Sequence, residues 1–426
     1  MFTFSSSFMF DFELTRILGS ASGGGCDVGE FKSALSKIKN DDPESWYVAW
    51  NDQAERAQRI ADEAAKAGYR KPARNAYLRA SNYFRATSYM LSNDDARVVP
   101  FTERSIDCFQ RATTLMDGEV MCVDIPYEEG ISLPGYLFLP PRFARLSGKI
   151  PIVMYAAGAD STKEELYFLY GHTGPQLGYA VLCLEGPGQG LILKKSKIPL
   201  RPDFEVVAGK IVDFLVNLSE SRPALELDRE RIAMAGAATG GYFALRAATD
   251  PRIKACVSID PFFSLWDLCL SRAPKAFFKL WDSGWIPDGT FDMFTDRHGR
   301  GNFQAGWEIN LGKSSMGVEK PTAMFRRFKD FTLEPADGGI SILDKITCPV
   351  FLTGPGAGRD MYSSAEDSTF KIHRLLTNVP DKNKEIWVPT DVADGGLTAK
   401  IGAWALLAQK TFMFLDEHLG IERPQL

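Results

Sequence analysis

The sequence predicts an α/β protein in which helices cover both faces of a mostly parallel eight-stranded sheet. Three observations lead to this prediction. Apolar residues recur at helical spacing before about residue 116, short apolar runs then alternate with helical segments, and a glycine-rich strand-to-helix turn occupies residues 236–240. This order predicts a helical N-terminal domain followed by repeated strand–helix units, which pack as a sheet between helices.

The N-terminal domain is expected to cover residues 1–116 and to be helical from residue 28. Residues 1–10 are apolar but include no basic residue, so they are expected to pack on the protein body rather than to act as a signal peptide. Gly68 and Pro72 mark a break between two helices. The positions at helical spacing that predict a helix–helix core are Trp46, Trp50, Ala54, Ile60, Ala64, Tyr77, Ala80, Tyr83, Phe84 and Tyr89.

From residue 120 the apolar residues follow the pattern of strands. A hairpin is expected first, and then strands that alternate with helices, in two parts of one core domain that cover 117–260 and 336–426. The expected strands are 120–124, 134–139, 150–156, 179–184, 232–235, 253–259, 349–353 and 385–388. The expected helices begin at Lys163 or cover 204–218 and 398–419.

Between these two parts, residues 261–335 lose the regular pattern and are rich in aromatic side chains. An insertion after the sixth strand of such a sheet lies above the carboxyl ends of the strands, where ligands bind. We therefore expect a lid whose aromatic residues form its own core and also line the site. The residues expected to contact a substrate at its entrance are Asp260, Phe262, Trp266 and Asp267.

Charge and cysteine content exclude several classes of function. The 426 residues carry a net charge of −5 and no basic tract, which argues against nucleic acid as a partner. No apolar run approaches the roughly 18–20 residues that span a bilayer. Seven scattered cysteines without a CxxC pair predict reduced thiols in a cytoplasmic protein that needs neither a metal nor a cofactor. A small molecule is the expected partner, and a homodimer is left open.

The segment Gly236-Ala237-Ala238-Thr239-Gly240 follows an apolar strand and opens a helix of small residues. It matches Gly-x-Ser-x-Gly, the nucleophile elbow, in which a strained turn presents a hydroxyl above the sheet. The nucleophile position holds Ala238, which has no hydroxyl. Two interpretations stay open: an inactivating replacement of serine made to trap a ligand, or a natural loss of hydrolysis.

Three further segments carry a resemblance, namely Gly158-Ala-Asp-Ser-Thr-Lys-Glu-Glu165, Glu185-Gly-Pro-Gly-Gln-Gly190 and Gly395-Gly-Leu-Thr-Ala-Lys-Ile-Gly-Ala403. In this order, over roughly residues 30–420, the sequence resembles an α/β-hydrolase. More narrowly, it resembles the branch with a helical N-terminal domain, which includes fermentation–respiration switch esterase-like proteins and pseudooxynicotine-type hydrolases. It is most similar to hydrolases of fungal polyketide pathways, in particular cytochalasan-type and other pyrrolinone-forming ones.

The resemblance implies a serine, an acid and a histidine in that chain order, with an oxyanion hole made of two backbone N–H groups. One donor would be Thr239, the residue after the nucleophile position, and the other would come from Gly158 or Ala159 in the loop after the third strand. Each such donor is commonly worth about 3–4 kcal/mol. Both are backbone groups, so both survive the loss of the serine.

The base and the acid depart from the family pattern. A histidine is expected after the last strand, but residues 388–399 contain none. Among the four histidines, His172 is the best candidate to approach the site, and a structural role is its alternative. Asp360 is displaced from where a compact triad would place the acid. Asp160 is better placed over the sheet, either as a helix cap or as a buried general base with a raised pKa.

Three functions follow. The first is a hydrolase of fungal secondary metabolism that cleaves an ester or carbon–carbon bond of a polyketide-derived or polyketide–amino-acid carbonyl compound, with serine expected at position 238. The second is a cyclase that forms a pyrrolinone by an intramolecular Knoevenagel-type condensation, with the oxyanion hole and a carboxylate or His172 as base. The missing histidine favours the second, because a serine without a base is a weak nucleophile. The third is an inactive ligand-binding protein.

Overall fold

Within residues 3–335, 339–358 and 364–424, which the computed structural model describes, eight strands form one sheet in the order β1-β2-β4-β3-β5-β6-β7-β8. Strand β2 is antiparallel to β1 and β4, and all other neighbours are parallel. The predicted mostly parallel sheet is therefore confirmed. The strands are β1 (Val120–Glu128), β2 (Ile131–Phe138), β3 (Ile150–Ala156), β4 (Ala180–Leu184), β5 (Leu227–Ala237), β6 (Ile253–Ile259), β7 (Val350–Thr353) and β8 (Lys384–Trp387).

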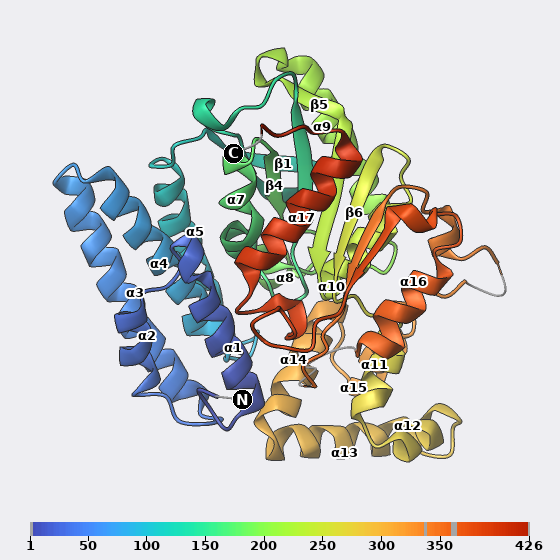
Figure 1. The fold of residues 1–426 in the computed structure, drawn as a ribbon. Coiled ribbons are helices and arrows are strands. Elements are labelled where there is room, and N and C mark those ends of the chain that lie inside the picture. Colours follow the sequence, from blue (N-terminus) through green and yellow to red (C-terminus); the bar gives the residue numbers. More distant parts are fainter. Residues whose placement is uncertain (1–2, 336–338, 359–363, 425–426) are drawn as a thin grey trace.

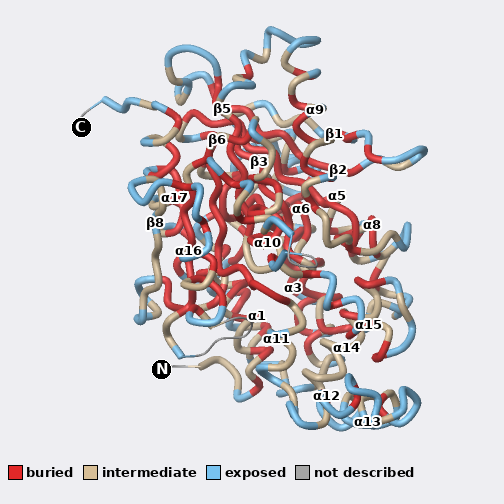
Figure 2. The backbone as a smooth tube through the Cα atoms, turned by 90° about the vertical axis from the view of Figure 1, so that its right-hand side faces the viewer, coloured by how far each residue is buried: buried red, intermediate tan, exposed pale blue. Residues whose placement is uncertain are grey.

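Apolar side chains fill both faces of the sheet. In β3, Ile152 and Met154 belong to the core on one face, and Val153 and Tyr155 belong to the core on the other. A parallel strand that is buried on both sides is apolar at every position, which is why β3 was visible in the sequence. Helices cover both faces (Figure 1), and buried residues concentrate along the strands (Figure 2). The helices of this core are α6 (Lys163–Leu166), α7 (Thr173–Gln176), α8 (Gly190–Lys194), α9 (Phe204–Ser221), α10 (Thr239–Ala247), α16 (Lys371–Leu375) and α17 (Trp404–Leu419).

The N-terminal region packs as a helical layer beside the sheet (Figure 1). Asp42 caps the long helix α3, with Pro43 at its first position, and Gly68 ends the turn before α4 with a φ of 80°. Helicity begins earlier than the expected residue 28, because α1 buries Phe10 and Leu14 completely, and the expected packing of this segment on the body is confirmed. The helices are α1 (Phe8–Gly19), α2 (Val28–Leu35), α3 (Pro43–Lys66), α4 (Arg70–Tyr89) and α5 (Val98–Thr113).

Residues 261–335 are helical rather than irregular, which corrects the expectation from the lost pattern. The five elements, which we call the lid helices, are α11 (Leu265–Arg272), α12 (Lys275–Asp282), α13 (Asp288–Gly301), α14 (Phe303–Met316) and α15 (Pro321–Phe328). These helices are too short for a long periodic pattern. Side-chain caps such as Ser264 and Asn302 begin a new helix after each break. Their aromatic residues form the expected core, in which Trp281 stacks on Phe291 at a centroid distance of 4.2 Å.

Two further details differ from the sequence prediction. The last helix begins at Trp404 rather than at residue 398, because Ala399 and Lys400 both adopt a φ of +54° and interrupt it. The strand of the elbow is longer than expected and begins at Leu227. The thiols of Cys183, Cys256 and Cys348 are buried and free, as expected for reduced cysteines. Among the described helices, none combines the length and the apolar character needed to cross a bilayer.

Candidate active site

The turn between β5 and α10 has the backbone of a nucleophile elbow. Ala238 adopts a φ of 53° and a ψ of −114°, a strained conformation for a residue with a side chain. Its N–H donates to the carbonyl of Ile259 at 2.8 Å, and its own carbonyl accepts from Gly241 and Tyr242 at 2.9 and 3.2 Å. The methyl group of Ala238 therefore occupies a fixed position at the carboxyl edge of the sheet, where this fold places a reactive hydroxyl.

Two glycines make this turn possible by close approach. A Cβ on Gly236 would lie 1.9 Å from the carbonyl oxygen of Gly240, and a Cβ on Gly240 would lie 2.8 Å from the carbonyl oxygen of Ala156 in β3. Helix α10 therefore begins in direct contact with β3 and with the loop that follows it. The elbow is a packing requirement of this fold even where no nucleophile is present.

Two backbone donors lie at this contact. Thr239 is the first residue of α10, so its N–H has no partner within the helix. Among the described residues, nothing accepts a hydrogen bond from the N–H of Thr239 or of Ala159. Gly158 lies beside the elbow, since a Cβ on it would be 3.6 Å from the carbonyl of Ala237. The oxyanion hole of Thr239, Gly158 and Ala159 stays a prediction, and free donors of this kind are what it requires.

His172 lies away from the elbow. Its ring nitrogens bond to the carbonyl of Tyr167 at 3.2 Å and to the hydroxyl of Thr173 at 3.1 Å. It faces a shallow depression lined also by Phe138, which pairs with Val181 near the amino end of β4. Burial lowers the pKa of His172, so the ring is neutral near pH 7. These contacts describe a structural histidine at the edge of the sheet opposite to Ala238.

The remaining histidines also lie elsewhere. His298 is exposed on α13 of the lid helices, and His418 packs on Phe414 in the last turn of α17. His373 lies on α16 near the charge of Lys384, the first residue of β8, and this places it toward the amino ends of the strands. Among the described residues, which include all four histidines, no imidazole is bonded to the elbow.

A buried ion pair lies at the carboxyl edge of the sheet, next to the loop where a histidine was expected. Asp260 follows β6, and Lys400 lies in the loop after β8, where the histidine was expected. The Nζ of Lys400 lies 2.9 Å from Asp260 Oδ1 and donates to the carbonyl of Gly354 at 2.8 Å. The other oxygen of Asp260 accepts from the backbone N–H of Ala399 at 2.7 Å, and Thr353 donates its hydroxyl to Oδ1 at 2.5 Å.

This arrangement changes the role of Asp260. Both of its oxygens are occupied by groups of the chain, and the Asp260 and Lys400 side chains are fully buried. We expected Asp260 to contact substrate, but the structure makes it an anchor that holds the loop after β8. Lys400 was not predicted, because the fold pattern calls for a histidine in this loop and a lysine there gives no sign in the sequence of a partner such as Asp260, 140 residues earlier.

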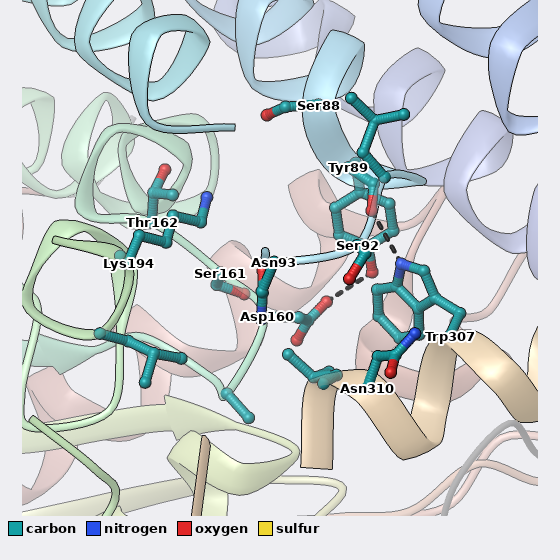
Figure 3. A pocket seen from close by; sticks show the side chains of 15 residues that line it. Ser88, Tyr89, Ser92, Asn93, Asp160, Ser161, Thr162, Lys194, Trp307 and Asn310 are labelled. Carbon is teal, nitrogen blue, oxygen red and sulfur yellow. Dashed lines mark hydrogen bonds between the residues drawn. The ribbon is translucent and has the colours of Figure 1, made fainter. Parts of the chain in front are cut away.

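A small pocket, partly open to solvent, lies between the N-terminal region, the core and the lid helices (Figure 3). The loop after β3 forms one wall, and the lid residue Trp307 bonds to the carbonyl of Tyr89 at 2.8 Å across it. Most of these residues were not predicted, because they come from four distant segments. The lining residues are Ser88, Tyr89, Leu91, Ser92, Asn93, Ala159, Asp160, Ser161, Thr162, Gly190, Leu193, Lys194, Trp307, Asn310 and Leu311.

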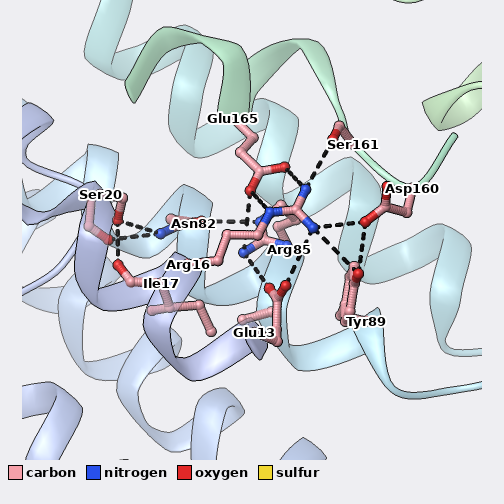
Figure 4. A network of polar contacts seen from close by, with 12 residues as sticks. Glu13, Arg16, Ile17, Ser20, Asn82, Arg85, Tyr89, Asp160, Ser161 and Glu165 are labelled. Atoms are coloured by element: carbon pink, nitrogen blue, oxygen red, sulfur yellow. Dashed lines mark hydrogen bonds and ion pairs between the residues drawn. The ribbon is translucent and has the colours of Figure 1, made fainter. Parts of the chain in front are cut away.

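Asp160 lines this pocket, but it is held as an anion. Its Oδ2 accepts from Tyr89 Oη and from an Arg16 guanidinium nitrogen, both at 2.7 Å (Figure 4). Burial alone would raise the pKa of this carboxyl, but the Arg16 charge and the hydrogen bond from Tyr89 outweigh burial and lower it. The expectation of a general base with a raised pKa is therefore wrong for Asp160.

Arg16 joins Asp160 to a wider buried network. It also pairs with Glu165 and Glu13, and its second terminal nitrogen donates to Ser161 Oγ at 2.9 Å. Arg85 lies 2.7 Å from Glu13 on the other side. Helix α1 therefore holds the loop after β3 through Arg16, within a network of five charged side chains (Figure 4).

The other predicted site residues lie outside the pocket. Phe262 is buried and stacks on Tyr242 at 4.7 Å, and Trp266 packs on Phe278 within the lid helices. Asp267 is exposed in the first turn of α11, where Ser264 caps the helix. Asp360 lies outside the described residues. The pocket therefore brings together Ala159 and Asp160 of the predicted set.

Comparison with known proteins agrees with this geometry. The family of FrsA-like esterases matches residues 40–280. The chain is 84% identical to the alpha/beta hydrolase pydG of Acremonium sp. over 426 residues, which is all of both chains. It is 71% identical to the alpha/beta hydrolase gkaG of Penicillium citrinum, over 100% of this chain and 99% of that one. It is 46% identical to the hydrolase ORFZ of Pyricularia oryzae over 98% of each chain.

A solved structure shares the architecture as well. The 2,6-dihydroxy-pseudo-oxynicotine hydrolase superposes with a TM-score of 0.70, over 94% of this chain and 95% of that one, at 20% identity. At this level of identity the likeness shows the fold. The helical N-terminal region, the sheet and the lid helices thus have counterparts in one known protein.

Proposed function

The chain belongs to the α/β-hydrolases and, within them, to the FrsA-like esterase family, and from this premise we propose that it is an enzyme that forms a carbon–carbon bond rather than hydrolysing one. The reaction is an intramolecular Knoevenagel-type condensation. A carbon between two carbonyl groups attacks an aldehyde of the same molecule and water is lost, which gives a pyrrolinone. The substrate is a polyketide–amino-acid carbonyl compound, the class that the sequence resemblance implies.

One observation supports this proposal: the N–H groups of Thr239 and Ala159, the predicted oxyanion donors, are free, and the described residues at this edge of the sheet place neither a hydroxyl at position 238 nor a histidine beside it. Ala238 has no hydroxyl, and Lys400 occupies the loop where a histidine would act. A hydrolase needs a nucleophile and a base, and neither is found here among the described residues. The N–H groups of Thr239 and Ala159 can act without a serine or a histidine, because their role is to stabilise a negatively charged oxygen.

The condensation passes through a negatively charged enolate, which those donors can stabilise. The carbon between the two carbonyls releases one proton to water and gives an enolate, whose oxygen Thr239 and Ala159 would hold. The enolate carbon then forms the new bond to the aldehyde carbon. The resulting alkoxide takes up a proton and leaves as water when the second proton of the same carbon is removed, so the double bond forms without an oxidant.

Hydrolysis with serine at position 238 is the second candidate, because the backbone of the elbow is intact. The test compares the chain with Ala238→Ser on p-nitrophenyl acetate and butyrate, and on a β-keto amide of an α-amino aldehyde. We expect cyclisation of the amide by the unaltered chain and no ester hydrolysis by either form, since the added serine still lacks a base. Ester hydrolysis that appears only in Ala238→Ser, without cyclisation, would overturn the proposal.

A further inference from the structure

Lys194 stands apart from the other buried lysines of the core. Lys163 lies 2.8 Å from Glu164, and Lys400 lies 2.9 Å from Asp260, so each has a carboxylate partner. The Nζ of Lys194 donates to the Thr102 hydroxyl at 3.1 Å, and among the described residues no carboxylate lies within ion-pair distance of it. Lys194 therefore presents an amine whose hydrogen-bond partner is a neutral hydroxyl.

This amine lines the pocket together with the predicted oxyanion loop. Lys194 and Ala159 are both in the lining, and Figure 3 shows Lys194 among the polar side chains there. Thr162 lines the same pocket, and its buried hydroxyl has no hydrogen-bond partner in the described part of the chain. An amine can add to a carbonyl carbon, and an unpartnered hydroxyl can bond to the oxygen of the tetrahedral adduct that forms. Both groups line this pocket.

The surroundings of Lys194 favour its neutral, nucleophilic form. Burial lowers its pKa, and the positive charges of Arg85 and Lys163 act in the same direction, although Glu185 and Glu164 oppose them. A neutral amine is the form that adds to carbonyl carbons. Glu185 also fixes the position of this lysine, because its carboxylate accepts from Lys163 and Leu191 at the starts of α6 and α8.

We propose that Lys194 is a catalytic residue that forms an imine with the aldehyde of the substrate; this inference rests on the condensation proposed above. The lysine nitrogen adds to the aldehyde carbon, and the carbinolamine loses water to give the imine. The proton released by the activated carbon protonates the imine nitrogen. The enolate carbon then attacks the iminium carbon, and the electron pair of the C=N bond returns to nitrogen.

The cycle closes without a further reagent. The attacking carbon loses its second proton to the lysine nitrogen, the C–N bond breaks, and the C=C bond forms as the free amine is regenerated. The net change is the loss of one water from the substrate, as in the uncatalysed condensation. Lys194 thus supplies a better electrophile than the aldehyde itself, with Thr162 available to bond to the carbinolamine oxygen.

The first experiment traps the imine in the full-length chain. The protein is incubated near pH 7 with hexanal and sodium cyanoborohydride, and the alkylated lysines are located by peptide mass spectrometry. We expect Lys194 to be alkylated at least tenfold faster than Lys195, its exposed neighbour, which pairs with Glu103. Alkylation of Lys194 no faster than Lys195 would overturn the inference, and this readout needs no variant.

The second experiment separates the inference from the proposed function. Lys194→Arg keeps a cation but cannot form an imine, and Lys195→Arg is the matched control. We expect a loss of at least a hundredfold in the rate of β-keto amide cyclisation for Lys194→Arg, and a change of less than twofold for Lys195→Arg. Undiminished cyclisation in Lys194→Arg would overturn the imine and leave the condensation standing. Selective alkylation without any cyclisation by the unaltered chain would overturn the condensation, and with it the catalytic role of Lys194.

Discussion

The turn after β5 and the loop after β8 lie at the same edge of the sheet, yet they depart from a serine hydrolase site in different ways. The turn at Ala238 has the full backbone geometry of a nucleophile elbow and lacks the reactive atom. The loop at Lys400 has a buried charged side chain where a proton carrier would act, and it is tied to Asp260. Packing of glycines therefore accounts for the geometry of the first region, and a buried ion pair accounts for that of the second.

The largest expected effect comes from a substitution that breaks the packing of the elbow. Gly236→Val places a side chain against the carbonyl of Gly240, where even a Cβ would be 1.9 Å away, so we expect a loss of at least about 4 kcal/mol in the free energy of unfolding. Urea unfolding measures this loss. The matched control is Gly209→Ala in α9, where nothing lies within 4 Å and a gain of about 0.5–1 kcal/mol is expected. Equal behaviour of the two variants would contradict the role of packing.

The second largest effect is expected from a substitution that breaks the ion pair after β8. Lys400→Met leaves Asp260 buried without its counter-ion, and we expect a loss of about 3–4 kcal/mol in the free energy of unfolding. The double variant Lys400→Met with Asp260→Asn removes both charges and should recover at least half of this loss. If the double variant is no more stable than Lys400→Met, electrostatics is not what holds this loop.

A third change tests the anion in the pocket through its pH dependence. Asp160→Asn removes the charge that Arg16 stabilises, at a cost of about 1–2 kcal/mol near pH 7. Because the pKa of Asp160 is lowered in the folded state, this contribution is complete above the ordinary value of 3.8 and is lost as the pH falls through the lower folded pKa. Urea unfolding of both proteins at pH 6 and pH 3 should show the difference shrink at pH 3. A difference that grows at pH 3 would mean that the pKa is raised instead.

The smallest effect concerns the strained residue itself. Ala238→Gly removes the side chain at a φ of 53°, so we expect a gain of about 0.5–1 kcal/mol in the free energy of unfolding. Ala238→Ser keeps a Cβ and should change the free energy by less than about 0.5 kcal/mol. Thermal unfolding followed by circular dichroism ranks the three proteins. A clear gain in Ala238→Ser over Ala238→Gly would show that a hydroxyl finds a partner there.

The sequence predicted the sheet well, because its central parallel strands, such as β3 and β4, are apolar runs of the kind that burial on both faces requires. It predicted the elbow for a related reason, since glycines at 236 and 240 leave a local signature. It could not find Tyr89, Lys194 and Trp307 as neighbours, because they lie on α4, α8 and α14 and meet only through tertiary packing. It also mistook the sign of the pKa change of Asp160, since Arg16 lies 144 residues away in the sequence.

Residue Arg16 has a practical consequence for where the protein can be cut. The match to the FrsA-like family begins at residue 40, so a boundary taken from that match would discard α1. A shortened chain of this kind would retain the sheet, the elbow and the lid helices. It would nevertheless lose the guanidinium that neutralises Asp160 and Glu165, and two buried carboxylates would then repel each other beside the pocket. We therefore expect that α1 is needed to hold the loop after β3, and that a shortened protein has to begin before this helix.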